Sequence, residues 1–373
     1  MAGAELPCPG GAMTSTQELH DAGQSLWLDN ITRDLLTSGQ LQNYIDEYAL
    51  TGLTSNPSIF DKAIEESRAY DREIAQALSR GQGAQDIFFE LAIADLRVAA
   101  DMFRPIHDRT AGVDGWVSLE VSPLLAEDSP ATIQAAGRLH QRAGRPNLFI
   151  KIPGTANGVE AIEECIFAGL PINVTLLFSA AQYQAAAEAY LRGVERRIEA
   201  GLDPEVGSVA SLFVSRWDKL VNAKVPDALR DRVGIAAAAQ AYRAYRKLLD
   251  SARWQRLANQ GARPQRLLWA STSTKDPAAS DVLYVEALAA PFTINTMPEQ
   301  TLLAFADHGQ VGALMPADGG DADQVIVELA EAGLDFEMLA SDLQRQGAEA
   351  FDESWRSLLA CIGGKAAQMS GGD

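Results

Sequence analysis

A single lysine stands inside an apolar run near the middle of the chain. The segment 147–155 reads Asn-Leu-Phe-Ile-Lys-Ile-Pro-Gly-Thr, and Lys151 is flanked in it by aliphatic and aromatic side chains. The run has the length and apolarity of a strand covered on both faces, and its Pro-Gly pair ends it. Burial disfavours the charged ammonium, so Lys151 could supply the free amine that attacks a carbonyl to form a Schiff base. The structural alternative is a lysine at a strand end whose head reaches water.

Several other strand-like runs end in polar side chains. Residues two apart on a strand share one face, and the chemistry of a parallel barrel lies at the carboxyl ends of its strands. The polar or aromatic side chains at these ends are Asp29, Thr54, Asn56, Glu120, Asn173, Thr175, Ser211 and Phe213. Each has a structural explanation when taken singly: Asn56 precedes a proline and suits a turn, Thr175 is an ordinary strand former, and Asp29 could cap a helix.

As a set, these side chains are more informative. If the strand faces are assigned correctly, a lysine, two carboxylates, two amides and several hydroxyls point into one barrel mouth. Each buried polar group that is left unpaired costs about 1 to 3 kcal/mol. Unpaired buried polar groups destabilise the fold, so their number calls for a functional reason. The set therefore predicts a catalytic or binding site.

Short apolar runs alternate with longer helix-like stretches along the chain. We expect eight strands, at Leu26–Ile31, Leu50–Thr54, Trp116–Val121, Leu148–Ile152, Ile172–Phe178, Val209–Val214, Leu267–Ser271 and Phe292–Thr296. Strands that alternate with helical patterns form parallel βαβ units, and eight such units predict an α/β fold of the closed (β/α)8 (TIM) barrel type. An open doubly wound sheet is the second choice. We expect one domain over residues 1–373, with loose ends at about 1–20 and 363–373.

Several helical segments exceed a minimal barrel. Two helical patterns occupy 61–109, a helical insertion fills 217–261 after the sixth strand, and two C-terminal helices are expected at 322–332 and 335–362. The last of these carries an apolar stripe made of Leu339, Leu343, Phe351, Trp355, Leu358 and Ile362. Such a stripe packs on the barrel or on a second subunit, so a homodimer is a candidate.

Three helix starts are expected from capping signals. Ser129 stands before Pro130, and a cap followed by proline is typical of a first helical turn. Asn157 and Ser179 precede Glu160 and Gln182 by three positions, the spacing of a capping box. The last two signals directly follow strand-like runs, as a βα unit requires.

Composition and charge exclude several classes of function. The chain has 31 basic and 50 acidic residues, and its net charge of -19 disfavours nucleic acid and anionic membranes as partners. Its cysteines, Cys8, Cys165 and Cys361, form no CxxC pair and have no histidines at ligand spacing, so neither a disulfide framework nor a zinc site is expected. We see no signal peptide and no apolar run of about 18 residues, and we expect a cytoplasmic protein. The sequence contains no glycine-rich phosphate-binding loop, so nucleotide binding is not indicated.

Six short segments together resemble the transaldolase family, most closely its longer bacterial type. They are Leu28-Asp29, Thr54-Ser-Asn-Pro-Ser58, Val117-Ser-Leu-Glu-Val-Ser122, Phe149-Ile-Lys-Ile-Pro153, Asn173-Val-Thr-Leu-Leu-Phe-Ser179 and Ser211-Leu-Phe-Val-Ser-Arg216. They occur in the family's order and span roughly residues 25 to 300, which makes them far more specific than any single motif. The resemblance implies a single-domain (β/α)8 barrel with class I aldolase chemistry that needs no metal and no cofactor.

The resemblance implies a role for each matching residue. Lys151 would form a Schiff base with the C2 ketone of a ketose phosphate, such as sedoheptulose 7-phosphate or fructose 6-phosphate. Asp29 would take the proton of the C4 hydroxyl, and Glu120 would move protons through a water held by Thr175. A dihydroxyacetone unit would then pass to erythrose 4-phosphate or glyceraldehyde 3-phosphate, as in the pentose phosphate pathway. The implied substrate-binding residues are Asn56, Asn173, Ser211, Phe213, Arg216, Ser271 and Lys275.

One part of the family's phosphate site is missing. Arg216 and Ser271 match that site, but Ser273 stands where the shorter family members carry a second arginine. Lys275 could restore the charge two residues later, or it could be a solvated lysine that opens the next helix. We favour the phosphate role, because Arg216 alone would face a dianion in a strongly acidic protein.

Three functions remain open at this point. A transaldolase needs an acceptor sugar, whereas a fructose 6-phosphate aldolase releases free dihydroxyacetone. Phe213 favours the first, since the aldolase branch carries at this position a tyrosine whose hydroxyl helps water to release the three-carbon unit. A phosphosugar-binding barrel without catalysis would have no use for Lys151 between two acids. The preferred sugars and the oligomeric state are not determined by the sequence.

Overall fold

The computed structural model describes the backbone of residues 13–370 and the side chains of residues 13–365. Eight parallel strands form a closed barrel in the order β1-β2-β3-β4-β5-β6-β7-β8. Their bounds are β1 (Gln24–Asp29), β2 (Leu50–Thr54), β3 (Trp116–Glu120), β4 (Leu148–Pro153), β5 (Ile172–Leu177), β6 (Ser208–Phe213), β7 (Arg266–Ala270) and β8 (Thr293–Met297). The prediction of a (β/α)8 barrel is therefore confirmed, and the open doubly wound sheet is excluded.

The strands are apolar because both of their faces are covered. Every residue of β2, β3, β4, β5, β6 and β8 is buried. Parallel pairing aligns Glu120 with Lys151, and Lys151 with Asn173, across three neighbouring strands. The strand register thus holds Glu120, Lys151 and Asn173 at the same height along the barrel axis. Side chains from separate strands are in this way brought close together.

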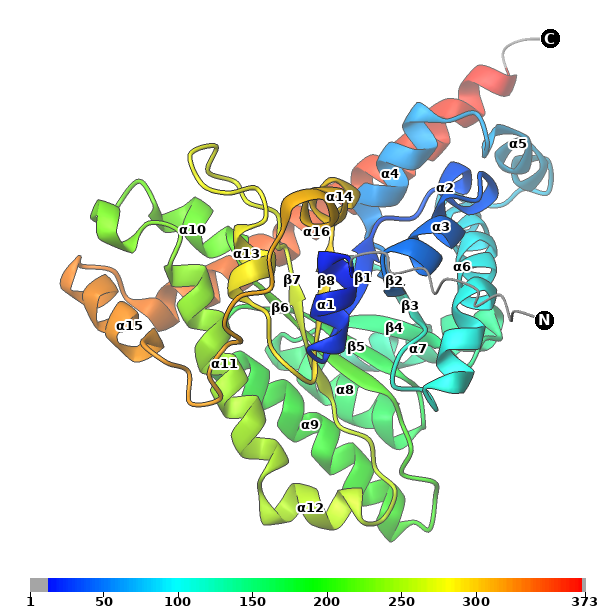
Figure 1. Ribbon diagram of the computed structural model, residues 1–373. Coiled ribbons are helices and arrows are strands. Elements are labelled where there is room, and N and C mark those ends of the chain that lie inside the picture. Colours follow the sequence, from blue (N-terminus) through cyan, green and yellow to red (C-terminus); the bar gives the residue numbers. More distant parts are fainter. Residues whose placement is uncertain (1–12, 371–373) are drawn as a thin grey trace, which may run out of the picture.

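Helices surround the barrel and also cover one of its ends. Their bounds are α1 (Ser15–Asp21), α2 (Arg33–Thr37), α3 (Gln40–Glu47), α4 (Pro57–Glu66), α5 (Asp71–Ser79), α6 (Ala84–Arg109), α7 (Ser129–Ala143), α8 (Ala156–Phe167), α9 (Ala180–Glu199), α10 (Ser215–Val221), α11 (Val233–Leu249), α12 (Ala252–Ala258), α13 (Leu283–Ala287), α14 (Glu299–His308), α15 (Ala322–Glu331) and α16 (Phe336–Ser370), with 3-10 turns at Pro123–Leu125 and Asp227–Leu229. The long helix α16, red in Figure 1, runs past the barrel from beside α15 to beside α4 and α5.

Aromatic side chains fill the half of the barrel interior that lies nearer the amino ends of the strands. Trp27 lies 6.2 Å from Phe149, whose ring stacks on Trp116 at a centroid distance of 4.0 Å. The indole of Trp27 also explains Gly52 on the neighbouring strand, because a Cβ there would lie 2.5 Å from the ring. A side chain larger than hydrogen at position 52 would displace the tryptophan.

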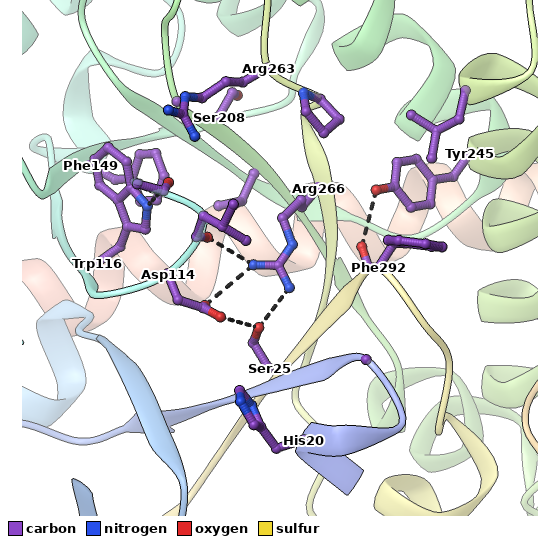
Figure 2. Close-up of a pocket in the computed structure, with 17 residues that line it drawn as sticks. His20, Ser25, Asp114, Trp116, Phe149, Ser208, Tyr245, Arg263, Arg266 and Phe292 are labelled. Carbon is purple, nitrogen blue, oxygen red and sulfur yellow. Dashed lines mark hydrogen bonds and ion pairs between the residues drawn. The ribbon is translucent and has the colours of Figure 1, made fainter. Parts of the chain in front are cut away.

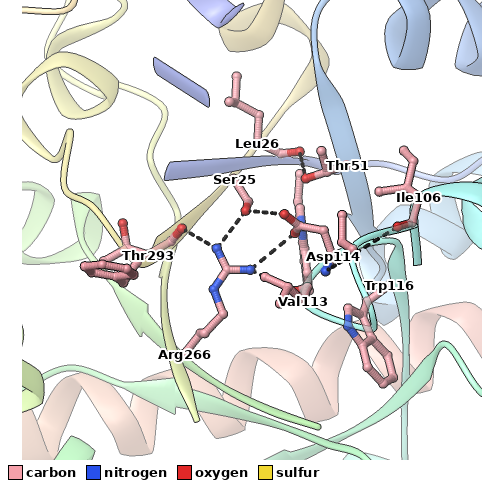
Figure 3. Close-up of polar contacts among 12 residues, drawn as sticks. Ser25, Leu26, Thr51, Ile106, Val113, Asp114, Trp116, Arg266 and Thr293 are labelled. Carbon is pink, nitrogen blue, oxygen red and sulfur yellow. Dashed lines mark hydrogen bonds and ion pairs between the residues drawn. The ribbon is translucent and has the colours of Figure 1, made fainter. Parts of the chain in front are cut away.

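A polar cluster closes the floor of the barrel, at the amino ends of the strands. We call Ser25, Asp114 and Arg266 the floor cluster (Figure 3). Ser25 Oγ donates to Asp114 Oδ2 at 2.6 Å, and Arg266 Nη2 donates to Ser25 Oγ at 2.7 Å. Arg266 also pairs with Asp114 Oδ1 at 3.3 Å and donates to the carbonyls of Val113 and Thr293. The charges of this cluster are therefore fully compensated within the chain.

A cavity of about 430 Å³ lies beside the floor cluster (Figure 2). Its walls are mainly apolar and include Trp116, Phe149 and Phe292. Arg263 also lines it, but its guanidinium is paired with Glu205. Because both arginines of this cavity have partners in the chain, the cavity offers no free positive charge.

The ends of the chain differ from the sequence expectation. We expected loose ends at about 1–20 and 363–373, yet residues 15–20 belong to α1, where Leu19 is completely buried. At the other end α16 continues to Ser370, and Lys365 Nζ donates to Asp71 Oδ1 at 2.7 Å. The expected ends were too long on both sides. Residues 1–12 and 371–373 lie outside the described residues.

The insertions follow the expected regions with some differences in detail. Region 61–109 and its approach hold three helices (α4, α5 and α6) rather than two, whereas the insertion after β6 and the two C-terminal helices are present. The C-terminal stripe is buried within the chain: α16 packs on α4 and α6, and Trp355 contacts Phe88 and Phe89. None of the helices in the described part of the chain is long and apolar enough to cross a membrane.

Candidate active site

A cavity of about 180 Å³ opens at the carboxyl ends of the strands. The sequence-predicted residues that line it are Asp29, Thr54, Asn56, Lys151, Thr175, Ser211, Phe213, Arg216, Ser271 and Lys275. Glu120 and Asn173 do not line it, although both are buried close to Lys151 through the strand register. The structure therefore brings the predicted residues to one end of the barrel, as the alternation along the strands indicated.

Lys151 lies in the interior of this end of the barrel. Its side chain is 7% exposed, and its Nζ donates to the carbonyl of Ser55 at 3.0 Å. Nζ is also 3.5 Å from Glu120 Oε2. The head of Lys151 thus does not reach bulk water, which removes the alternative of a solvated lysine at a strand end. A buried amine that opens onto a cavity can reach a carbonyl carbon placed there.

Asp29 lies across the cavity on β1. Thr54 Oγ1 donates to Asp29 Oδ1 at 2.8 Å, and Thr296 lies 2.7 Å from Thr54 Oγ1. Because Thr54 has a single hydroxyl proton, Thr296 must donate to Thr54 when Thr54 donates to the carboxylate. Burial raises the pKa of Asp29 above its ordinary value, and the charge of Lys151 and the bond from Thr54 oppose that rise. A carboxylate with a raised pKa is a better proton acceptor than an exposed one.

Glu120 and Thr175 have buried atoms without a hydrogen-bond partner in the described chain. Both carboxylate oxygens of Glu120 lack one, and so does Thr175 Oγ1. Burial raises the pKa of Glu120, the nearby Asp29 adds to the rise, and the charge of Lys151 opposes it. Buried polar groups are almost always paired in proteins, so these oxygens beside Lys151 have the capacity to make further hydrogen bonds.

The side chains of Asn56, Asn173 and Ser211 differ in their hydrogen-bond partners and in whether they line the cavity. Asn173 is fully buried, donates to Ser118 Oγ at 3.1 Å and accepts from Ser211 Oγ at 2.7 Å. Asn56 caps α4, because its Oδ1 accepts from the amide of Ile59 at 3.1 Å, and its side chain still lines the cavity. Asn56 is therefore a helix cap, where the sequence suggested a turn, and it lines the cavity as well. Asn173 belongs to a hydrogen-bonded layer that supports the cavity.

Arg216 lines the same cavity from α10. Its guanidinium is 5.0 Å from the ring centroid of Phe213 and makes no ion pair with an acid among the described residues. Burial lowers its pKa, although an arginine remains charged. Ser271 follows β7 with a left-handed φ of 55°, and its Oγ lies 2.9 Å from Ser215 Oγ. Backbone strain of this kind is concentrated at functional sites.

Lys275 is exposed at the same end of the cavity. Its Nζ donates to Ser273 Oγ at 2.5 Å, so the residue in the position of the missing arginine holds the lysine. Partial burial lowers the pKa of Lys275, and the positive charges of Lys219 and Arg216 lower it further. Lys275, Lys219 and Arg216 thus bring positive charge together at this end of the cavity in a protein whose net charge is -19.

Sequence reasoning missed five lining residues, namely Ser58, Ala270, Thr296, Pro298 and Phe351. Thr296 ends β8 and could have been found by the strand-end rule that identified the others. Ser58 follows Asn56 in the same turn and could have been found with it. Phe351 comes from α16, far along the chain, and no local pattern marks it as a site residue. Among the described residues, no group of three or more His, Cys, Asp or Glu side chains could hold a metal ion.

Comparisons with known proteins identify the family to which this chain belongs. The family model described as Transaldolase/Fructose-6-phosphate aldolase matches residues 26–362. A protein from Frankia alni named Transaldolase is 45% identical over 354 residues, covering 92% of this chain and 95% of its own length. A protein named Transaldolase 2 from Nostoc is 40% identical and covers 96% of this chain, and one named Transaldolase from Thiobacillus denitrificans is 43% identical over 94%.

Proposed function

Because the chain belongs to the transaldolase/fructose-6-phosphate aldolase family, we propose that it is a transaldolase that transfers a dihydroxyacetone unit between phosphorylated sugars. The observation that carries the proposal is the buried amine of Lys151, which opens onto the cavity and lies 3.5 Å from Glu120. Transaldolases are transferases, so the enzyme class follows from the family. The donor would be sedoheptulose 7-phosphate or fructose 6-phosphate.

The first step joins the donor to Lys151. The neutral amine adds to the C2 carbonyl carbon, and water leaves to give an iminium ion. Two proton transfers accompany this step, one to the carbinolamine oxygen and one from the nitrogen. Glu120 and Thr175 suit them, because their unpartnered oxygens can hold a water between carboxyl and substrate. The raised pKa of Glu120 lets it carry the proton.

The second step breaks the bond between C3 and C4. Asp29 accepts the proton of the C4 hydroxyl, the C3–C4 electron pair moves into the iminium, and an aldose phosphate leaves. An enamine of the three-carbon unit stays on Lys151. When an acceptor aldehyde binds, C3 of the enamine attacks its carbonyl and Asp29 returns the proton to the new hydroxyl. Water then releases the new ketose from Lys151.

The phosphate end of the sugar lies with Arg216, Ser271 and Lys275 in this proposal. Arginine binds phosphate through paired N–H donors, and Lys275 adds a second charge where the shorter relatives have an arginine. Arg216 is available because no acid among the described residues pairs with it. Asn56 and Ser211 would contact the hydroxyls of the three-carbon unit, with Ser211 held by Asn173.

Two further expectations stay predictions. We propose a cytoplasmic location, in keeping with Cys165 and Cys361, which are both free thiols in the described chain. A homodimer is still a candidate, but the stripe of α16 is buried within the chain, so the insertion 217–261 is the remaining contact surface. Light scattering, which measures the mass of the native protein, will distinguish a homodimer from a monomer.

An acceptor-dependence assay tests the proposed function. The enzyme is incubated with fructose 6-phosphate, with and without erythrose 4-phosphate, and both sedoheptulose 7-phosphate and free dihydroxyacetone are quantified. A transaldolase forms sedoheptulose 7-phosphate and little dihydroxyacetone, because Phe213 has no hydroxyl to help water release the enamine. Rapid formation of dihydroxyacetone without acceptor would instead identify an aldolase.

A further inference from the structure

One face of α16 lies over the carboxyl end of the barrel. Ala340, Gln344, Gly347 and Phe351 are spaced by four, three and four residues, so they form one stripe along the helix. Phe351 lines the cavity that contains Lys151, and Ala340 and Gly347 are buried. We call these four residues the inner stripe of α16. The sequence marked this helix only for its packing.

Hydrogen bonds fix the inner stripe to the barrel. Gln344 Nε2 donates to the carbonyl of Gly154 at 3.0 Å and to that of Leu176 at 2.9 Å. Gly154 follows the strand of Lys151, and Leu176 lies on the strand of Thr175 with a left-handed φ of 61°. The side chain of Gln182 donates to the carbonyl of Ala340 at 3.3 Å. The helix is therefore tied to the ends of two catalytic strands.

Gly347 is the point at which α16 meets Arg216. A Cβ on Gly347 would lie 3.1 Å from Arg216 Nη1 and 2.9 Å from Leu176 Cδ2. The guanidinium thus lies between the ring of Phe213 and the backbone of α16. Neither neighbour is an acid, so packing orients the arginine and leaves its N–H donors free for an anion.

The acids of α16 are kept away from Arg216. None of the four stripe residues is acidic, although the helix contains Glu337, Asp342, Glu349, Asp352 and Glu353. Three of these acids pair with arginines of the same helix: Arg345 contacts Asp342 and Glu349, and Arg356 contacts Asp352. Arg216 therefore meets an uncharged helix face in an otherwise acidic protein.

From these contacts we infer that the inner stripe of α16 is part of the phosphate subsite, and that Gly347 is a positioning residue which acts through Arg216. The inference rests on the proposed function for the identity of the substrate phosphate. Gly347 permits the helix to approach Arg216, and Gln344 holds the helix at that height. A methyl group at position 347 would crowd both Leu176 Cδ2 and Arg216 Nη1, and the resulting shift of the guanidinium weakens phosphate binding while Lys151 is not contacted.

The matched variants are Gly347→Ala and Gly363→Ala, which make the same change in the same helix. A Cβ on Gly363 would meet nothing within 4 Å, so this control carries the helix-propensity effect alone. For Gly347→Ala we expect the KM for fructose 6-phosphate to rise about tenfold, as when a charge-assisted hydrogen bond is lost, with kcat within about twofold. Borohydride trapping of dihydroxyacetone, which has no phosphate, stays unchanged. Gly363→Ala behaves like wild type.

A coupled variant separates positioning from general damage. In an Arg216→Ala background, Gly347→Ala should raise KM no further, because the group it displaces is gone. Gln344→Ala removes the hydrogen bonds that hold α16 to the barrel and should also raise KM. Because it adds no atoms, it can replace Gly347→Ala as the test variant if Gly347→Ala folds poorly. Equal KM values for wild type, Gly347→Ala and Gln344→Ala, or an undiminished effect of Gly347→Ala without Arg216, would overturn the inference.

Binding of inorganic phosphate tests the inference without turnover. Calorimetric titration with phosphate should give a weaker affinity for Gly347→Ala than for Gly363→Ala, by the same factor as the change in KM. This measurement is independent of Lys151: if wild type forms no adduct, the proposed function fails while the phosphate result still decides the role of α16. Equal phosphate affinity in both variants contradicts that role.

Discussion

The two ends of the barrel both contain a buried ion pair, but only on the floor do both oxygens of the buried carboxylate accept hydrogen bonds. On the floor, Arg266 binds Asp114, Ser25 and two carbonyls. At the mouth, Lys151 faces Glu120 at 3.5 Å, and both oxygens of Glu120 lack a hydrogen-bond partner. The same barrel therefore contains one ion pair whose carboxylate is fully hydrogen-bonded and one whose carboxylate is not.

The difference separates stability from chemistry. A buried pair with all its partners costs little in the folded state, and breaking it is expensive. A cluster with unpartnered oxygens instead raises the free energy of the fold and becomes favourable only when a ligand pairs it. Barrels with catalysis at one end and stability at the other fit this division. Substitutions at the mouth should change activity, and those on the floor should change stability.

The largest expected effect is that of Lys151→Ala. Without the amine no iminium can form, so we expect kcat to fall by at least about a thousandfold. Burial already favours the protonated forms of Glu120 and Asp29, so the loss of the cation leaves acids that can become neutral, and the fold should persist. Steady-state kinetics with thermal unfolding measures both. An active variant would exclude the Schiff base.

Asp29→Asn should have the next largest effect. The amide cannot accept the C4 proton, and loss of a general base lowers kcat by roughly a hundredfold or more. The amide still accepts the hydrogen bond from Thr54, so the adduct on Lys151 should form. Single-turnover cleavage separates the two steps. An unchanged cleavage rate would assign the proton transfer to another residue.

On the floor, Arg266→Met should lower stability and leave catalysis intact. Removing one partner of a buried pair costs about 3 to 5 kcal/mol in the free energy of unfolding. The kcat/KM of the folded variant should stay within about threefold of wild type. Chemical denaturation measures the change in the free energy of unfolding.

Arg263→Met is the matched control for the floor. Arg263 lines the same cavity and pairs with Glu205, whose side chain is 53% exposed, so the loss should be at most about 1 kcal/mol. A floor variant that lost activity as completely as Lys151→Ala would break the separation of the two ends.

The smallest expected effect is a shift in the pH profile. Asp29 must be ionised to accept a proton, so cleavage rises with pH as Asp29 loses its proton. Because burial raises the pKa of Asp29, this rise should lie above about pH 4, the range of an exposed carboxyl. Thr54→Val removes a hydrogen bond that lowers the pKa and should move the rise to higher pH. A shift to lower pH would contradict this account.

Local patterns predicted the barrel and most of the mouth. All eight strands lie at the predicted places within about two residues, because a strand covered on both faces must be apolar. Strand alternation placed Lys151, Asp29 and Thr175 at one end. The contact of α16 with Arg216 depends on residues 131 positions apart in the chain (347 minus 216), and local patterns carry no such information.

Helix starts were less accurate than strands. The cap of α7 is Asp128 rather than Ser129, and the cap of α8 is Thr155 rather than Asn157. Only Ser179 caps its helix as expected, with Gln182 reaching back to the amide of Phe178. Several side chains in one turn can accept the same orphan amides, so spacing alone does not select among them.

Trapping the intermediate tests the central claim most directly. The protein is incubated with fructose 6-phosphate and borohydride, and its intact mass and peptides are compared with those of Lys151→Ala. We predict one reduced three-carbon unit on the peptide that contains Lys151, absent in the variant. If fructose 6-phosphate binds but no adduct forms, or if the adduct maps to another lysine, the assignment of Lys151 as the Schiff-base residue is wrong.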